Sequence, residues 1–319
     1  MTSFTWASAP KPVVSLAPMA GVTDASYRQL IKKIAPEVVV YTEFLSSDAL
    51  AYGAKRTMEM LAFDATIERP FIVQIFGDTP EHFLAAAKVI EAIGADGIDI
   101  NMGCPAAKVI SSCHGAALIK NPKLAAELVH ATKKAVSIPV SVKTRLGWDR
   151  ADTLIDFCKG LEEAGADAFA IHGRRYCDKF TGKADWSQIY ELKKAVKVPV
   201  FGNGDVYSAQ DALDKIGNLD GVMVGGGTFG NPWLMTEIVD AFADRNAPVV
   251  PKTFHEKLPM IIEHCELSVA IKGERLGMLE MRRHLSSYVK GFDGAADLRS
   301  KLVRVEKLAE AKSLLLSAA

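Results

Sequence analysis

The stretch GIDINMGCP, residues 97–105, ends a largely apolar run with a cysteine placed between a glycine and a proline. A run such as GIDI is typical of a strand buried on both faces of a parallel sheet. Asn101, Gly103 and Cys104 follow where such a strand ends. A cysteine at that place is either a small packing residue or a chemically active group, and the rest of the sequence helps to decide between the two.

Seven further short apolar runs repeat this pattern along the chain, each bounded by glycine or proline. Apolar residues at helical spacing separate several of them, as in 81–93, 122–136, 153–165 and 208–217. Strands alternating with helices predict an α/β fold of the (β/α)8 TIM-barrel type. An open doubly wound sheet is less favoured, because no GxGxxG follows the first strand. The eight predicted strands are 13–19, 38–44, 71–77, 97–103, 140–146, 168–174, 200–206 and 221–227.

The pattern changes after Pro248. PVVPKT, residues 248–253, is a proline-containing linker, and the sequence beyond it contains helix-like segments but no strand-like run. We therefore predict a barrel domain over residues 1–247 and a small all-α domain over residues 248–319. From Ala270 onward the chain has 10 Lys+Arg against 6 Asp+Glu, although the whole chain has a formal net charge of +0. A basic end favours an anionic partner, but a solvated helical surface can have the same composition.

Cysteine usage and hydropathy limit the class of protein. The 5 cysteines are scattered and form no CxxC pair, so we expect reduced thiols rather than a disulfide framework or a metal site. The N-terminus lacks a signal-peptide pattern, and no apolar run reaches the ~20 residues that a membrane span needs. We expect a soluble, cytoplasmic protein with no membrane contact, and the sequence implies no protein partner.

Polar residues and glycines gather at the predicted C-terminal ends of the strands, where (β/α)8 enzymes carry their active sites. Burying polar groups without partners costs ~1–3 kcal/mol each, so a binding site explains them better than stability alone. Glycines leave room for a phosphate on backbone N–H groups, and a buried lysine suits an anion or an electron-rich ring. These features fit flavin mononucleotide (FMN). The residues are Gln74, Asn101, Lys143, Arg145, His172, Asn203, Gly204, Asp205, Gly225 and Gly226.

Beside such a cofactor, Cys104 can act as a general acid. An ordinary thiol has a pKa near ~8.5, so at neutral pH it is protonated and can deliver a proton to a carbanion-like atom. A nucleophilic role would need a lowered pKa and a neighbouring base. The adjacent pair Cys113 and His114 does not establish such a couple, because neighbours in sequence need not face each other.

The motifs along the chain resemble, in order, those of the tRNA-dihydrouridine synthases, and most of all the bacterial B-type subgroup. A later segment, RRHLSSYVKGF (282–292), resembles the helical RNA-binding domain of the same family. The barrel motifs are LAPMAGVTD (16–24), TEF (42–44), VQIFG (73–77), DINMGCPAAKV (99–109), VKTRLGWD (142–149), IHGR (171–174), GNGDV (202–206) and GVMVGGGTFGNPW (221–233).

The resemblance implies a reaction. FMN on the barrel rim is reduced by NADPH and passes a hydride to C6 of a uracil ring in tRNA, while Cys104 protonates C5. Residues 1–247 form the FMN-binding catalytic domain and residues 248–319 the tRNA-binding domain. The implied roles are FMN binding by Pro18, Met19, Gln74, Lys143, His172, Asn203, Gly204, Asp205, Gly225 and Gly226, uracil positioning by Asn101, Lys143 and Arg145, and tRNA binding by Arg282 and Arg283.

Two departures from the family pattern bear on these roles. Gly226 stands where the family has an arginine, so a phosphate contact is missing or is supplied elsewhere. Ala107 stands where the family often has a lysine. Two other functions stay open: an FMN-dependent oxidoreductase of a free pyrimidine, similar to the dihydroorotate dehydrogenases, and a catalytically inactive RNA-binding relative.

Overall fold

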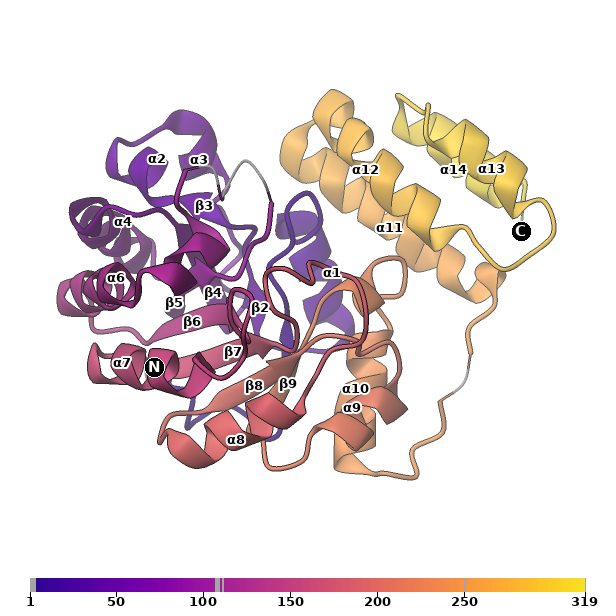
Figure 1. Ribbon diagram of the computed structural model, residues 1–319. Helices are drawn as coiled ribbons and strands as arrows, with labels where there is room; N and C mark the ends of the chain where they lie inside the picture. Colours follow the sequence, from indigo (N-terminus) through magenta and orange to yellow (C-terminus); the bar gives the residue numbers. More distant parts are fainter. Residues whose placement is uncertain (1–3, 107–109, 111, 250, 319) are drawn as a thin grey trace.

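The computed structural model describes residues 4–106, 110, 112–249 and 251–318. A nearly closed barrel of parallel strands lies at its centre, with helices around it (Figure 1). A short strand, β3 (Leu45–Ser46), continues the second strand and pairs with β4. The eight barrel strands are β1 (Val13–Leu16), β2 (Val40–Tyr41), β4 (Phe71–Phe76), β5 (Gly97–Met102), β6 (Val140–Arg145), β7 (Ala168–His172), β8 (Val200–Asn203) and β9 (Gly221–Val224).

The barrel closes between its first two strands. The sheet follows the order β1-β9-β8-β7-β6-β5-β4-β2. A parallel bridge joins Ser15 to Val39, and the N–H of Leu16 donates to the carbonyl oxygen of Val39 at 2.9 Å. The predicted (β/α)8 fold is therefore confirmed. The observed strands end earlier than the predicted runs, and the final residues of each run belong to the segments that follow the strands.

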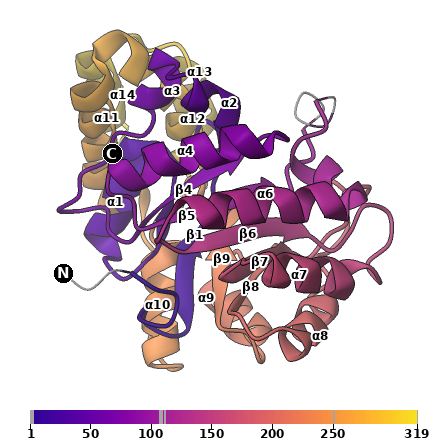
Figure 2. The ribbon, with the colours of Figure 1, turned by 90° about the vertical axis from the view of Figure 1, so that its left-hand side faces the viewer.

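The helices predicted between the strands are present. They are α4 (Pro80–Ala92), α6 (Pro122–Ala135), α7 (Leu154–Glu163) and α9 (Ala209–Lys215), and the first three lie side by side on the outside of the barrel (Figure 2). Ser208 caps α9, as its position in the sequence predicts, by accepting from the N–H of Asp211 at 3.0 Å. The other helices around the barrel are α1 (Ala25–Ile34), α2 (Ser47–Ala51), α3 (Lys55–Glu59), α8 (Ser187–Ala195) and α10 (Leu234–Ala243), with short 3-10 helices at Gly115–Lys120 and Gly226–Thr228.

The interior of the barrel is apolar at one end and polar at the other. Successive side chains of a strand point to opposite faces, so every second residue points inward. Near the N-terminal ends of the strands, Trp6, Tyr41, Phe201 and Met223 form a separate apolar cluster. Toward the C-terminal ends the inward positions carry buried polar groups instead. These groups are Gln74, Asn101, Arg145, His172 and Asn203, and the buried Asp99 and Ser141 lie nearer the N-terminal ends of β5 and β6.

The chain after the barrel is helical, as predicted. Four helices build a second apolar cluster at one side of the barrel (Figure 1), and α11 packs on α1. Thr253 and Glu256 form a capping box that starts α11. The division into domains at residues 247 and 248 stays a prediction. The four helices are α11 (Phe254–Lys272), α12 (Glu274–Tyr288), α13 (Ala295–Leu302) and α14 (Leu308–Leu316).

Among the described residues, no helix is long and apolar enough to cross a bilayer.

The close contact between β1 and β9 leads to a test of how tightly these two strands pack. A Cβ added at Gly221 would collide with the backbone carbonyl of Val13, whereas one added at Gly226 meets nothing within 4 Å. Gly221→Ala should therefore lower the free energy of unfolding by about 1–3 kcal/mol, measured by denaturant titration. Gly226→Ala is the matched control and should change it by less than about 0.5 kcal/mol. Equal losses in both variants would contradict the steric explanation.

Candidate active site

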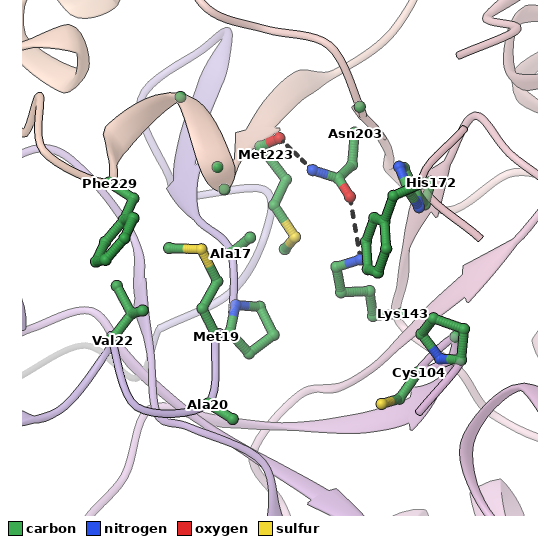
Figure 3. A pocket seen from close by; sticks show the side chains of 18 of the residues that line it. Ala17, Met19, Ala20, Val22, Cys104, Lys143, His172, Asn203, Met223 and Phe229 are labelled. Carbon is green, nitrogen blue, oxygen red and sulfur yellow. Dashed lines mark hydrogen bonds between the residues drawn. The ribbon is translucent and has the colours of Figure 1, made fainter. Parts of the chain in front are cut away.

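A cavity of about 470 Å³ opens at the C-terminal ends of the strands (Figure 3). Its volume is in the range of small-ligand sites in proteins, roughly 300–1,000 Å³. Fourteen of the fifteen residues that the sequence assigns to the site line it. They are Pro18, Met19, Gln74, Asn101, Cys104, Lys143, Arg145, His172, Asn203, Gly204, Asp205, Gly225, Gly226 and Arg283.

Arg282 is the predicted residue that does not line the cavity. Its Nε donates to the carbonyl oxygen of Val305 at 2.9 Å, and its Nη2 donates to that of Arg304 at 3.1 Å. The side chain thus holds α12 to the segment between α13 and α14. Its role in tRNA binding stays a prediction. Ala107 lies outside the described residues.

Cys104 presents its thiol to the cavity. Figure 3 shows its Sγ pointing inward, toward the segment that carries Met19 and Ala20. The backbone around it is held from two sides. The Oδ1 of Asn101 accepts from the N–H groups of Gly103 and Cys104 at 3.1 and 3.0 Å, and the Nε of Arg145 donates to the carbonyl oxygen of Gly103 at 2.7 Å. These bonds fix the loop that displays the thiol.

Cys113 and His114 do not line the cavity. Cys113 is exposed, and the Nε2 of His114 lies 3.5 Å from the Oδ1 of Asp78. The described geometry therefore gives this pair no part in the site.

Lys143 brings a positive charge to the centre of the cavity. Its Nζ donates to the Oδ1 of Asn203 at 3.1 Å, and the Nδ2 of Asn203 donates to the carbonyl oxygen of Met223 at 2.7 Å (Figure 3). Burial and the nearby charge of Arg145 lower the pKa of Lys143 to about 8. The amine is therefore charged at neutral pH and becomes neutral in mildly alkaline solution.

The sequence places Arg174 at the end of a predicted strand, within the IHGR motif, but assigns it no role, and it also lines the cavity. Its Nη2 donates to both carboxylate oxygens of Asp205, at 2.8 and 2.9 Å. Burial and the charges of Lys143, Arg145 and Arg174 lower the pKa of His172 far below its usual value, so the imidazole is neutral. The signal was present in the sequence, because Arg174 follows His172 by two positions at the end of a strand.

Three aromatic residues of the cavity wall, Phe180, Tyr207 and Phe229, were also missed. They lie in loops, where no periodic pattern predicts the direction of a side chain. Phe180 is 73% exposed, and the guanidinium carbon of Arg145 lies 5.3 Å from the centre of its ring. A large exposed ring at the mouth of a cavity is suited to stacking on a planar ligand.

The glycines after β9 form a rim without side chains. A Cβ at Gly225 would lie 3.3 Å from the Cβ of Ala17 and 3.5 Å from the Sδ of Met19, and one at Gly227 would collide with the backbone of Val206. Gly226 differs, because a Cβ there would meet nothing within 4 Å, so the space beside its backbone is open. A rim of bare backbone, a lysine and several neutral hydrogen-bonding groups together suit a flat cofactor with a phosphate, and FMN fits this set of residues.

A closed (β/α)8 barrel with such a rim, a central lysine and a displayed thiol defines the class of a cofactor-dependent barrel enzyme. Comparison with known proteins assigns the family. The family model named dihydrouridine synthase (Dus) matches residues 15–319. The chain therefore belongs to the dihydrouridine synthase family, and the resemblance described from its motifs is confirmed.

Individual relatives agree with this assignment along nearly the whole chain. A probable tRNA-dihydrouridine synthase 1 from Synechocystis is 37% identical, covering 94% of this chain and 84% of the relative. The tRNA-dihydrouridine synthase B of Pseudomonas aeruginosa is 36% identical, covering 91% and 88%. A probable tRNA-dihydrouridine synthase from Mycobacterium tuberculosis is 39% identical, covering 95% and 81%.

A solved structure supports the fold. Histamine dehydrogenase from Rhizobium sp. 4-9 matches with a TM-score of 0.53 at 13% sequence identity. The match covers 80% of this chain and 48% of that protein, so this chain spans about half of its length. At such low identity the likeness concerns the fold alone.

The ion pair between Arg174 and Asp205 can be tested by mutation. The side chain of Arg174 is 8% exposed and that of Asp205 is 23% exposed. Arg174→Met should lower the free energy of unfolding by about 2–4 kcal/mol, because a half-buried carboxylate loses its cation. Arg150→Met is the control, since Arg150 pairs with Asp152 on the open surface, and it should cost less than about 1 kcal/mol. Similar losses in the two variants would show that burial does not strengthen the inner pair.

Proposed function

We propose that this protein reduces a uridine in tRNA to 5,6-dihydrouridine, with FMN as its cofactor and NADPH as the reductant. The observation that carries the proposal is the display of the Cys104 thiol into the same cavity as the Lys143 amine and the glycine rim. Membership of the dihydrouridine synthase family supports it. A tRNA substrate also implies a cytoplasmic location, which is part of this proposal.

The residues that would hold FMN are those of the rim and the floor of the cavity. Gly225 and Gly226 offer backbone N–H groups to a phosphate, while Lys143 and Gln74 offer a charge and an amide to the ring. FMN held here would, after reduction by NADPH, provide the hydride for C6 of uracil. The protein has to bind the base, exclude water and supply the second hydrogen as a proton.

Cys104 is the proposed proton donor. Its S–H bond breaks as a C–H bond forms at C5 of the uracil ring, and a thiolate remains. Lys143 and Arg145 lie close enough for their charges to interact with Cys104.

We propose that the helical region, residues 248–319, binds the tRNA. Arg283 of α12 reaches the cavity, where its Nη1 donates to the carbonyl oxygen of Ala20 at 3.1 Å and its guanidinium carbon lies 5.2 Å from the ring centre of Phe229. A base must leave its stack to reach the cavity, at a cost of a few kcal/mol. Contacts from Arg283 and stacking on Phe180 can offset that cost.

The central test is Cys104→Ala. This variant should keep its FMN content and its bleaching by NADPH, because Cys104 is assigned to proton transfer alone. Formation of dihydrouridine in tRNA, measured by nucleoside mass spectrometry, should fall at least about 100-fold. Cys113→Ala, at an exposed thiol outside the cavity, is the control and should retain turnover. Undiminished turnover in Cys104→Ala would refute the proton-donor role.

The charge of Lys143 predicts a pH dependence. Because its pKa is lowered to about 8, the amine carries its proton below that pH and loses it as the pH rises above it. Turnover should therefore fall as the pH rises through about 8. In Lys143→Arg the positive charge persists to much higher pH, so this limb of the pH profile should move upward or vanish even if the maximum rate is lower. If turnover falls at the same pH in the wild type and in Lys143→Arg, the titrating group is not Lys143.

A further inference from the structure

A buried carboxylate, Asp99, lies beneath the cavity without lining it. Its side chain is 0% exposed and stands on β5, beside Gln74 of β4 and Ser141 of β6 in the sheet register. The Nε2 of Gln74 donates to its Oδ2 at 2.6 Å, and the Oγ of Ser141 donates to its Oδ1 at 2.6 Å. Both carboxylate oxygens are therefore engaged by short hydrogen bonds from neighbouring strands.

A chain of hydrogen bonds leads upward from Asp99 to the loop of Cys104. The Nδ2 of Asn101 donates to the Oε1 of Gln74 at 2.9 Å. The Oδ1 of Asn101 then accepts from the backbone N–H groups of Gly103 and Cys104. Gln74 is 0% exposed and Asn101 is 6% exposed, so water does not compete for these bonds.

The ionisation of Asp99 decides which groups donate and which accept along this series of hydrogen bonds. Burial raises the pKa of Asp99 to about 6, so it is ionised at neutral pH. An ionised carboxylate accepts hydrogen bonds and cannot donate them. Gln74 must therefore present its NH2 group to Asp99 and its oxygen to Asn101, and Asn101 must present its NH2 group to Gln74 and its oxygen to the loop.

This direction also decides what Asn101 offers to a ligand. Its oxygen has two lone pairs, and the N–H groups of Gly103 and Cys104 occupy both. Its nitrogen carries two hydrogens, and Gln74 takes one of them. Among the bonds of the described residues, one N–H of Asn101 is left, and Asn101 lines the cavity.

We propose that Asp99 is a positioning residue that, through Gln74 and Asn101, fixes the loop of Cys104 and makes position 101 a hydrogen-bond donor toward the substrate. A donor at this place matches a ring carbonyl oxygen and opposes a ring amino group. The arrangement thus favours uracil, which has two carbonyl oxygens, over cytosine, which has an amino group. The part concerning the substrate rests on the proposed function, whereas the part concerning the hydrogen-bond chain does not.

A charge-conserving exchange tests the chain in the full-length protein. Asn101→Asp alone places a carboxylate against the side-chain oxygen of Gln74, so two acceptors face each other. A flip of the Gln74 amide would relieve this contact but would turn its oxygen toward the carboxylate of Asp99. At pH 8 this variant should lose about 5 °C in Tm. Adding Asp99→Asn lets both bonds of Gln74 reverse, so that Gln74 donates to position 101 and accepts from position 99, while the bonds from Gly103, Cys104 and Ser141 keep their direction. The double variant should regain more than half of the lost Tm and has the net charge of the wild type.

Ser141→Ala, combined with Asn101→Asp, is the matched control. Ser141 also donates to Asp99 but lies outside the chain to the loop, so its removal should give no rescue. The proposal is supported if Asp99→Asn restores the Tm of the Asn101→Asp variant and Ser141→Ala does not. Additive losses from Asp99→Asn and Asn101→Asp would overturn it, because they would show that the two positions are not coupled.

Kinetics of the double variant test the second part. With a carboxylate at position 101, the donor toward the substrate is gone although the fold is restored, so kcat/KM for tRNA should fall about 10- to 100-fold while bleaching of the flavin by NADPH persists. An unchanged kcat/KM would overturn the role of position 101 in substrate choice. Failure of the wild type to act on tRNA would refute the proposed function instead, and the Tm comparison would still report on the chain.

Discussion

Closure of the barrel between β1 and β2 is the constraint on which the site depends. The bridge between Ser15 and Val39 completes the ring of parallel strands, so that all of them end at one rim. Only then does the segment after β1, with Pro18 and Met19, face the loop after β5, with Cys104. An open sheet in the same strand order would leave β1 at one edge, with β9, β8, β7 and β6 between it and β5. The cavity therefore results from the topology more than from any single residue.

Inside that rim the protein balances charges that would be costly alone. Lys143, Arg145 and Arg174 are three cations near one cavity, and burial together with their charges lowers the pKa of His172 and keeps it neutral. Asp205 offsets Arg174 directly, and Asp99 acts on Lys143 from beneath. The remaining positive charge suits an anionic cofactor. Such an anion would in turn stabilise buried cations that water solvates poorly.

The helical region is joined to the barrel by charges as well as by apolar contacts. Lys272 of α11 pairs with Asp24, which caps α1, and also with Glu280 of α12. Arg299 donates to the carbonyl oxygen of Val289 at 2.8 Å. Several basic residues of the C-terminal part thus hold the structure together, so the excess of positive charge overstates what is free to meet an RNA. Arg283 differs, because its side chain lines the cavity.

The sequence by itself determined the barrel and its eight strands. Of the fifteen residues that it assigned to the site, fourteen line one cavity. The strands and most of these residues follow from local patterns, because an apolar run predicts a strand and the end of a parallel strand predicts the rim, whereas Arg283 was assigned from the family resemblance. Tertiary structure alone decided the partners of long side chains. Arg282 donates to the carbonyl oxygens of Arg304 and Val305, in the segment between α13 and α14. Asp99 accepts a hydrogen bond from Gln74 of a neighbouring strand. Such partners depend on which distant segments the fold brings within about 3 Å, and no local pattern contains that distance.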